Sequence, residues 1–529
     1  MPVWVVGARE SAERDRAAID RGTPARVLME RAGTAAAAEI ERRYVERLRD
    51  GAVVFTGPGN NGGDGWVVAG SLARAGIDVR VIEVAPSKSA DAISYRDAAI
   101  KSVRLVDSID DGSPVVVDAL LGTGFEGKPR GKIGDAVSTI NGLRARGSIV
   151  AALDVPSGLD ATTGDHSACV VADLTLSFGG VKRGTLLARD CCGEIVVIDI
   201  GLEDGNRDAG RGTRDAGHGP RRADHGEQEA ERLPMFVDWE WVRSQVPPIP
   251  FDAHKGTRKH LAIIGGGKGM PGAVVLAAKA ALRSGIGLVR TLVAPENVAA
   301  VLAAVPSVLN SEWPSTANQI NAEISSWADA AVIGPGLGKT TESRALVERI
   351  LRESKIPVLL DADALNDFEG DAAALGKLLS GRHALVTPHV AEFARLSGID
   401  SKEVIANRFD VGIGLARTLG ATVLLKGSPT VVFSPTGERF VIPRGTAALG
   451  TGGSGDLLSG IAGTLIAQLG NAQTAACCGA FVHGRAAELC AYIRGTTLED
   501  VLYALPRAWN EPERSPDPPL LTVLPAVAR

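Results

Sequence analysis

Short apolar runs alternate with helical patterns along both halves of the chain, and nearly every run ends in a cluster of Gly, Asp, Asn or Pro. The runs expected to form strands are residues 53–55, 79–82, 115–117, 149–153 and 174–176, then 261–264, 331–333, 358–360, 384–386 and 423–425. Strands that alternate with helices are typical of parallel α/β architecture. We therefore predict two doubly wound α/β domains that bind ligands at the carboxyl ends of their strands. The two halves share no motif, so we infer no internal repeat.

One stretch of the chain lacks this pattern. Residues 203–233 mix Gly, Arg, Asp, Glu and His with almost no apolar residues, and such a composition buries too little surface to offset the entropy of ordering. A chain of 529 residues is also too long for one hydrophobic core. We expect a first domain at residues 1–202, a flexible linker at 203–235, a second domain at 236–507 and a Pro-rich tail at 508–529.

Composition and charge exclude several classes of partner. The chain is 45% hydrophobic and 22% charged, and its net charge of −5 gives no general attraction for nucleic acid or an acidic membrane. No run approaches the ~20 apolar residues that span a bilayer, and residues 3–6 are too short for the core of a signal peptide. The six cysteines contain no CxxC pair, which argues against a zinc site. We expect a cytoplasmic protein with no nucleic-acid or membrane partner.

The strand expected at residues 53–55 runs into a glycine-rich loop, residues 57–65, with a helix expected from Trp66. Glycines allow close approach of the backbone, and a helix N-terminus offers free N–H groups to an anion. This composition between a strand and a helix predicts a phosphate or dinucleotide site.

Two further strand ends carry oxygen-bearing side chains. Asp118 follows the run at 115–117, while Asp154 and Ser157 follow the run at 149–153. In a doubly wound sheet, Asn61, Asp118 and Ser157 converge at one edge and offer hard oxygen ligands for an alkali or alkaline-earth cation. Taken alone, each has a structural alternative, because Asn61 and Ser157 suit turns and Asp118 suits a helix cap.

These motifs give residues 25–202 a resemblance to the NAD(P)H-hydrate epimerase family, also called the YjeF N-terminal domain. The matching segments are LMERAG at 28–33, GNNGGDG at 59–65, GTGF at 122–125 and DVPSGLD at 154–160. The resemblance implies that Asn61, Asp118 and Ser157 bind K⁺. The residues it implies for substrate binding are Asn60, Asn61, Gly62, Gly63, Asp64, Gly122, Thr123, Gly124, Phe125, Glu126, Gly127, Lys128 and Asp154. We take Asp154 as the catalytic group that moves protons at the hydroxyl-bearing C6 of the damaged ring, because a partly desolvated carboxylate can have its pKa tuned for that task.

The second half carries its most specific motif at residues 450–456, GTGGSGD, which opens a helix. Backbone N–H groups of a glycine-rich turn can stabilise a transferring phosphate, and an aspartate there can accept the proton of an attacking hydroxyl. The structural alternative is that Asp456 only caps the helix. No GxxxxGK[ST] sequence occurs, so this is not a Walker A loop.

Together with GPGLG at 334–338, DADALN at 361–366 and TPHxxEF at 387–393, this motif makes residues 240–507 resemble the ribokinase superfamily. Within it, the order of the motifs is similar to the ADP/ATP-dependent NAD(P)H-hydrate dehydratase family. The resemblance implies that Ala273, Gly336, His389 and the catalytic Asp456 contact the hydrate. The residues it implies for the AMP part of the nucleotide are Lys426, Gly427, Ser428, Pro429, Thr430 and Gly455. Alone, His389 would be read as a structural histidine. The chain has Lys268-Gly269-Met270 where the family usually has an aromatic residue, which leaves the packing under the nicotinamide undefined.

The two resemblances imply one pathway of cofactor repair. An epimerase interconverts the R and S hydrates of NADH and NADPH with K⁺ bound, and a dehydratase returns the S form to NAD(P)H with Mg²⁺ and ADP or ATP. We expect a homo-oligomer, although the sequence defines neither its size nor the preferred nucleotide or hydrate. Two alternatives stay open: a small-molecule kinase of the ribokinase superfamily fused to a binding domain, and a non-enzymatic scaffold. Scaffold relatives tend to lack the cation and carboxylate positions, which this chain retains.

Overall fold

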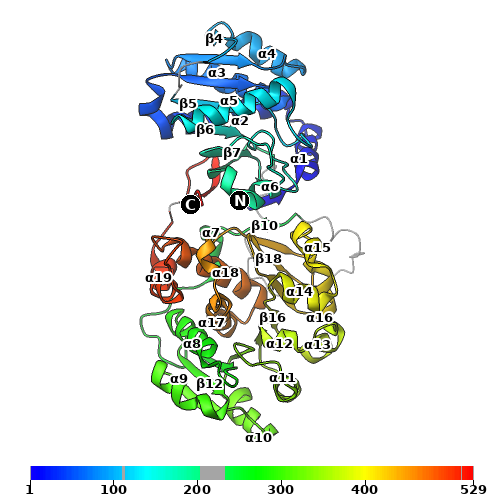
Figure 1. Ribbon diagram of the computed structural model, residues 1–529, viewed down its shortest axis with the longest axis vertical. Helices are drawn as coiled ribbons and strands as arrows, with labels where there is room; N and C mark the ends of the chain where they lie inside the picture. Colours follow the sequence, from blue (N-terminus) through cyan, green and yellow to red (C-terminus); the bar gives the residue numbers. More distant parts are fainter. Residues whose placement is uncertain (1, 110–113, 203–232, 514, 528–529) are drawn as a thin grey trace. The chain divides into compact units, whose positions relative to one another are not determined.

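The computed structural model describes residues 2–109, 114–202, 233–513 and 515–527. These divide into two compact units, the first containing the described residues up to 202 together with residues 515–527, and the second containing residues 233–513. Most of the expected linker, residues 203–232, lies outside the described residues. All ten expected strands are present, and both units have the predicted α/β architecture (Figure 1).

The first unit is built on an eight-stranded sheet with the order β20-β9-β7-β6-β5-β2-β3-β4, parallel throughout except for β20. A separate parallel pair joins β1 to β8. The chain winds outward from β2 to β4, then returns to add β5 on the opposite side of β2. This reversal is the switch point at which open α/β sheets bind their ligands. The strands are β1 (Val3–Val6), β2 (Ala52–Thr56), β3 (Val79–Glu83), β4 (Arg104–Leu105), β5 (Val115–Ala119), β6 (Ile149–Leu153), β7 (Leu174–Phe178), β8 (Val181–Lys182), β9 (Glu194–Ile198) and β20 (Leu520–Leu524).

Helices cover both faces of this sheet. Along β2, Val54 packs into one hydrophobic cluster with residues of α2 and α3, while Val53 and Phe55 pack into a second cluster with residues of α5. Alternate residues of one strand thus face opposite layers, which is why these strands read as continuous apolar runs. The helices are α1 (Ala8–Asp20), α2 (Ala25–Leu48), α3 (Asn60–Arg74), α4 (Ala90–Ala99), α5 (Gly131–Ala145) and α6 (Arg183–Leu187).

The glycine motif of the first unit differs from the expected long loop. Helix α3 begins at Asn60 rather than Trp66, so most of the motif forms its first turns. A Cβ on Gly57 would lie 1.8 Å from the Leu120 carbonyl oxygen, and one on Gly62 would lie 2.0 Å from the Gly57 oxygen. These two glycines are required because the backbones of neighbouring segments lie against them, a packing requirement that acts alongside any role in anion binding.

The second unit contains a larger sheet with the order β13-β12-β11-β14-β15-β16-β17-β18-β19-β10. It is parallel from β13 to β17, and β18 pairs antiparallel with both β17 and β19. Its switch point lies between β11 and β14, since the chain adds β12 and β13 on one side and β14 on the other. The strands are β10 (Met235–Phe236), β11 (His260–Ile264), β12 (Leu288–Val293), β13 (Leu309–Glu312), β14 (Ala330–Ile333), β15 (Val358–Leu360), β16 (Ala384–Val386), β17 (Thr422–Leu425), β18 (Thr430–Phe433) and β19 (Arg439–Ile442).

One face of this sheet is covered by the apolar helices α8, α17, α18 and α19, which share a single hydrophobic cluster with the strands. Helix α17 starts within the GTGGSGD motif, as expected, and helix α8 starts at Pro271. The helices are α7 (Trp239–Gln245), α8 (Pro271–Arg283), α9 (Val298–Ala304), α10 (Ala317–Ile320), α11 (Thr341–Glu353), α12 (Asp363–Asn366), α13 (Ala372–Leu379), α14 (Val390–Ser397), α15 (Ser401–Ala406), α16 (Gly412–Leu419), α17 (Ser454–Leu469), α18 (Ala472–Glu488) and α19 (Leu498–Asn510). In the described ranges, no helix combines the length and hydropathy needed to cross a membrane.

The C-terminal segment differs from the predicted tail. Helix α19 continues to Asn510, and after a Pro-rich stretch the sequence LLTVL forms β20, which pairs antiparallel with β9 (red in Figure 1). Leucines and β-branched residues suit a strand at a sheet edge. The last element of the chain therefore belongs to the first unit.

We expect Leu524→Ala to weaken the first unit, because the Leu524 side chain is 2% exposed and truncating a buried leucine costs at least about 2 kcal/mol. Faster amide hydrogen exchange in β9 would report the weaker packing of β20 against the first unit. Leu521→Ala, at a partly exposed position of the same strand, is the control and should have a smaller effect. Unchanged exchange in β9 for Leu524→Ala would contradict the role given to β20.

Candidate active sites

The first unit has a cavity of about 520 Å³ at its switch point, bounded by α1, α2 and the loops after β2 and β5. Eight of the expected substrate-binding residues line it: Asn60, Asn61, Asp64, Gly122, Thr123, Gly124, Phe125 and Asp154. Gly62 and Gly63 are buried against Gly57 and Met29 instead. Glu126, Gly127 and Lys128 are exposed and lie outside the cavity lining.

Asp154 follows β6 with a φ of 64°, an uncommon conformation for a residue other than glycine. Its carboxylate accepts a hydrogen bond from the Phe178 backbone N–H at 3.1 Å and lies 2.5 Å from the Lys182 ammonium. Lys182 is fully buried and also donates to the carbonyl oxygens of Phe178 at 2.7 Å and Gly180 at 3.4 Å. Because Lys182 is buried and contacts three oxygen atoms, it is held in one place and fixes the position of Asp154.

Sequence reasoning did not identify Lys182 or Asp15 as site residues, although both line the cavity. Lys182 comes shortly after the end of β7, so the strand-end argument applied to that strand would have found it. Asp15 lies on α1 and belongs to no motif. Burial raises the pKa of Asp15, and its neighbour Asp154 adds to the effect, while Lys182 opposes it.

Asp64 has a strongly perturbed carboxyl group. Burial is the largest cause that raises its pKa well above the usual range, and the negative charges of Asp154 and Asp15 act in the same direction. The Lys182 ammonium lowers this pKa but does not reverse the shift.

Asn61, Asp118 and Ser157 converge beside this cavity, as the strand-end argument predicted. The Asp118 carboxylate, 0% exposed, accepts from the Ser157 hydroxyl at 2.6 Å and from the Ser157 N–H at 2.8 Å. Asn61 Nδ2 donates to the Leu121 carbonyl oxygen at 2.9 Å. Asn61 Oδ1 is buried and has no hydrogen-bond partner among the described residues. Such an oxygen beside a buried carboxylate is suited to a cation.

The second unit has a cavity of about 500 Å³ at the carboxyl ends of β15, β16 and β17. Six of the expected residues line it: Ala273, Gly336, His389, Lys426, Gly455 and Asp456. Gly427, Ser428, Pro429 and Thr430 do not. The loop that holds them is fixed by buried Arg408, which donates to the carbonyl oxygens of Pro429 at 3.1 Å and Lys426 at 3.4 Å.

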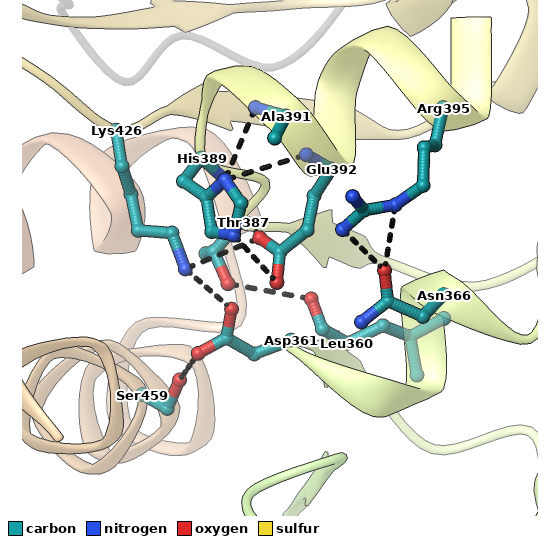
Figure 2. A network of polar contacts seen from close by, with 10 residues as sticks. All are labelled: Leu360, Asp361, Asn366, Thr387, His389, Ala391, Glu392, Arg395, Lys426 and Ser459. Atoms are coloured by element: carbon teal, nitrogen blue, oxygen red, sulfur yellow. Dashed lines mark hydrogen bonds and ion pairs between the residues drawn. The ribbon is translucent and has the colours of Figure 1, made fainter. Parts of the chain in front are cut away.

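Lys426 is the centre of a polar network in this cavity (Figure 2). Its ammonium lies 2.8 Å from Asp361 and 3.6 Å from Glu392, and the other Asp361 oxygen accepts from the Ser459 hydroxyl at 2.7 Å. Burial alone would lower the pKa of Lys426, but the charges of Asp361 and Glu392 raise it, so the ion pairs prevail. Asp361 and Glu392 lie within the motifs that carried the resemblance, but we had assigned them no role.

His389 has two contacts that explain its place before α14. Its Nδ1 accepts from the backbone N–H groups of Ala391 at 3.1 Å and Glu392 at 3.3 Å (Figure 2). Burial lowers the pKa of His389, although the Glu392 charge opposes this. His389 thus caps the helix, as the structural alternative allowed, and also lines the cavity.

Asp456 lies in the first turn of α17, where the raised pKa of its carboxyl distinguishes it from a simple cap. Burial and the nearby Asp361 and Asp363 charges raise this pKa to about 7, against the opposing effect of Lys426. No side-chain cap hydrogen bond is present at this helix start. A carboxyl group poised near neutral pH is suited to accept a proton.

Neither cavity contains a preformed cluster of metal ligands. Among the residues that the structure describes, no three His, Cys, Asp or Glu side chains are grouped to hold a metal ion. Mg²⁺ often keeps several waters and is held by one or two carboxylates together with substrate phosphates, so the second cavity is compatible with an ion that enters with a nucleotide.

Two family models match the chain: YjeF-related protein N-terminus over residues 25–184, and NAD(P)H-hydrate dehydratase over residues 261–507. The bifunctional NAD(P)H-hydrate repair enzyme Nnr of Coxiella burnetii is 34% identical over 492 residues, which cover 91% of this chain and 93% of the relative. Its Escherichia coli counterpart is 33% identical over 525 residues, covering 96% and 94%. A solved structure of the ADP/ATP-dependent NAD(P)H-hydrate dehydratase from Bacillus subtilis, co-crystallised with ATP and Mg²⁺, is 27% identical, with a TM-score of 0.46, and covers 53% of this chain and 99% of that one. The identity to the two Nnr relatives extends over both units, and the chain therefore belongs to the family of bifunctional NAD(P)H-hydrate repair enzymes.

Proposed function

We propose that the first unit interconverts the R and S hydrates of NADH and NADPH, and that the second unit converts the S hydrate back to NAD(P)H with ADP or ATP. The observation that carries this proposal is that the two candidate catalytic carboxylates, Asp154 and Asp456, line separate cavities in separate units. Each cavity also contains a lysine paired with a carboxylate. Cytoplasmic location and assembly into a homo-oligomer stay predictions.

The chemistry of the first cavity follows from the hydrate itself. C6 bears a hydroxyl and is bonded to the ring nitrogen, so inversion at C6 requires protons to leave and return near that oxygen. Asp154 is fixed by Lys182 and the Phe178 N–H, which leaves its carboxylate at the cavity wall as the group that moves the proton.

The chemistry of the second cavity overcomes the poor leaving ability of hydroxide. Asp456 takes the proton of the C6 hydroxyl as that oxygen attacks the terminal phosphate of the nucleotide. The N–H groups at the start of α17 stabilise the charge on the transferring phosphoryl group. A bound Mg²⁺ would supply further neutralisation of the phosphate charge. The ring nitrogen then expels phosphate from C6, and loss of a proton from C5 to water forms the C5=C6 bond and restores the dihydropyridine.

The K⁺ assignment is supported by the chemistry of its donors. Asn61 Oδ1, the Asp118 carboxylate and the Ser157 hydroxyl would hold the ion, whose positive charge would neutralise the buried Asp118. Burial raises the pKa of Asp118 to about 6 even though Ser157 donates to it twice, so a nearby cation would stabilise its ionised form.

The direct test mixes the purified protein with epimeric NADH hydrate, Mg²⁺ and either ADP or ATP. Full recovery of near-ultraviolet absorbance, with release of inorganic phosphate, is expected for the wild type. Asp154→Asn should convert the S portion at the normal rate and leave the R portion to spontaneous epimerisation. Asp456→Asn should lower the rate of dehydration at least about 100-fold, so that neither portion is converted on the time scale of the wild type. A stable phosphorylated product would favour the small-molecule kinase, and no conversion by the wild type would refute the proposal.

The dehydratase should lose activity as the pH falls through about 7. Asp456 must be ionised to accept a proton, and its pKa is raised to about 7. Initial rates at subsaturating hydrate should therefore fall tenfold per pH unit below that value and level off above it. An acidic limb near pH 4 would show that Asp456 is not the base or that its pKa is not raised.

K⁺ should raise the melting temperature of the first unit, and Asn61→Ala should abolish that response. A ligand present at a hundred times its Kd adds about 2.7 kcal/mol to stability, which corresponds to a shift of several degrees. Thermal unfolding in potassium chloride and in tetramethylammonium chloride makes the comparison. Asn141→Ala, which removes a half-buried amide that bonds Cys169 and Val171, serves as the control and should retain the response.

A further inference from the structure

The first cavity has more carboxylates than cations. Asp15, Asp64, Asp91 and Asp154 line it, and Lys182 provides the one ammonium among the lining residues that the structure describes. Lysine has three N–H donors, and those of Lys182 are directed to Asp154, Phe178 and Gly180. The Lys182 ammonium is therefore paired with one of the four carboxylates, that of Asp154.

Asp64 differs from Asp154 in its partners. No cationic side chain pairs with it within the described part of the chain, and it projects from the first turns of α3 into the cavity. Burial and the charges of Asp154 and Asp15 raise its pKa well above the usual range. Two carboxyl groups in one cavity, one paired with a lysine and the other without a cationic partner among the described residues, are suited to opposite roles as base and acid.

We propose that Asp64 is the second proton-transferring residue of the epimerase site, acting as the acid while Asp154 acts as the base, and that Lys182 is the residue that positions Asp154. This inference rests on the epimerase function proposed above and deepens it. Arg14, which acts on the charge of Asp15, is the other cation that faces this group of carboxylates.

The step balances without any further reactant. The C6 hydroxyl gives its proton to Asp154 while the C6–N1 bond breaks, and the electron pair of that bond goes to N1, which takes the proton of Asp64. C6 becomes an aldehyde, and rotation about the C5–C6 bond presents its other face to N1. Reclosure returns the N1 proton to Asp64 and the Asp154 proton to the oxygen, so the enzyme regains its starting state with C6 inverted.

The test follows conversion of the purified R hydrate to the S hydrate by chromatography, without nucleotide. Asp64→Asn should lower kcat by about 10²- to 10⁴-fold, the usual contribution of an acid or base, and should change KM less. The rate of the wild type should fall at high pH, because Asp64 must be protonated, and the residual rate of Asp64→Asn should lack this alkaline limb. Asp135→Asn, at an exposed site on α5 outside the cavity, is the matched control.

Asp15→Asn distinguishes proton transfer by Asp64 from a structural role, because a structural role would leave the pH of the alkaline limb unchanged. Removing the Asp15 charge removes one of the causes that raise the pKa of Asp64, so the alkaline limb should shift to lower pH. Lys182→Met should lower kcat, and Lys182→Arg should restore part of it. In every variant, dehydratase activity reports that the second unit is folded, and protection of β2, β5 and β6 against amide hydrogen exchange reports that the first unit is folded.

The two proposals fail in distinguishable ways. If the wild type does not interconvert the hydrates, the epimerase function itself is wrong. If the wild type is active, two results would contradict the role of Asp64 while the epimerase function stands. One is that Asp64→Asn keeps a near-normal kcat and the alkaline limb of its pH profile. The other is that Asp15→Asn does not shift the alkaline limb.

Discussion

One lysine among several carboxylates sets the charge balance in each cavity. Lys182 pairs with Asp154 in the first unit, and Lys426 pairs with Asp361 in the second. In both units, a further carboxylate with a raised pKa faces the same space, Asp64 in one case and Asp456 in the other. An ion pair in a poorly solvated cavity holds its members in place, while the remaining carboxyl group has a raised pKa and is suited to exchange a proton. Two unrelated sites thus reach the same electrostatic solution.

This arrangement depends on close approach of backbone segments at each switch point. In the first unit Gly57, directly after β2, lies against the Leu120 carbonyl oxygen, and in the second Gly265, directly after β11, lies against that of Pro335. A Cβ at either position would lie about 2 Å from that oxygen, so any other residue would push the two strand ends apart. The distances among the charged groups depend on how closely those strand ends approach.

The sequence was most informative where one rule covered many residues. The apolar runs predicted ten strands, all of which are present, and the strand-end rule brought Asn61, Asp118 and Ser157 to one edge. It was less informative where a role depends on a partner distant in sequence: nothing about Lys182 alone indicates that it pairs with Asp154, and Asp15 reaches the cavity only because α1 packs there. Ten further strands of the described residues were not predicted, β9 and β20 among them. Strand β9 was missed although Ile195 to Ile198 form an apolar run, and β20 was missed because it follows a Pro-rich segment that suggested a loose tail. The start of α3 was misplaced because the glycines appeared unsuited to a helix, whereas the tight packing around Gly57 and Gly62 requires them.

The position of β20 has a consequence for biosynthesis. The partner strand β9 ends at Ile198, but the residues that complete its edge begin at Leu520, so a ribosome must synthesise the whole second unit before they emerge. At about 5–20 residues per second, that interval lasts tens of seconds. During it, β9 is a nascent sheet edge with unpaired N–H and C=O groups, the kind of edge that recruits other strands. Protection of that edge by a chaperone or by the nascent second unit would therefore matter for this protein more than for one whose domains finish in order.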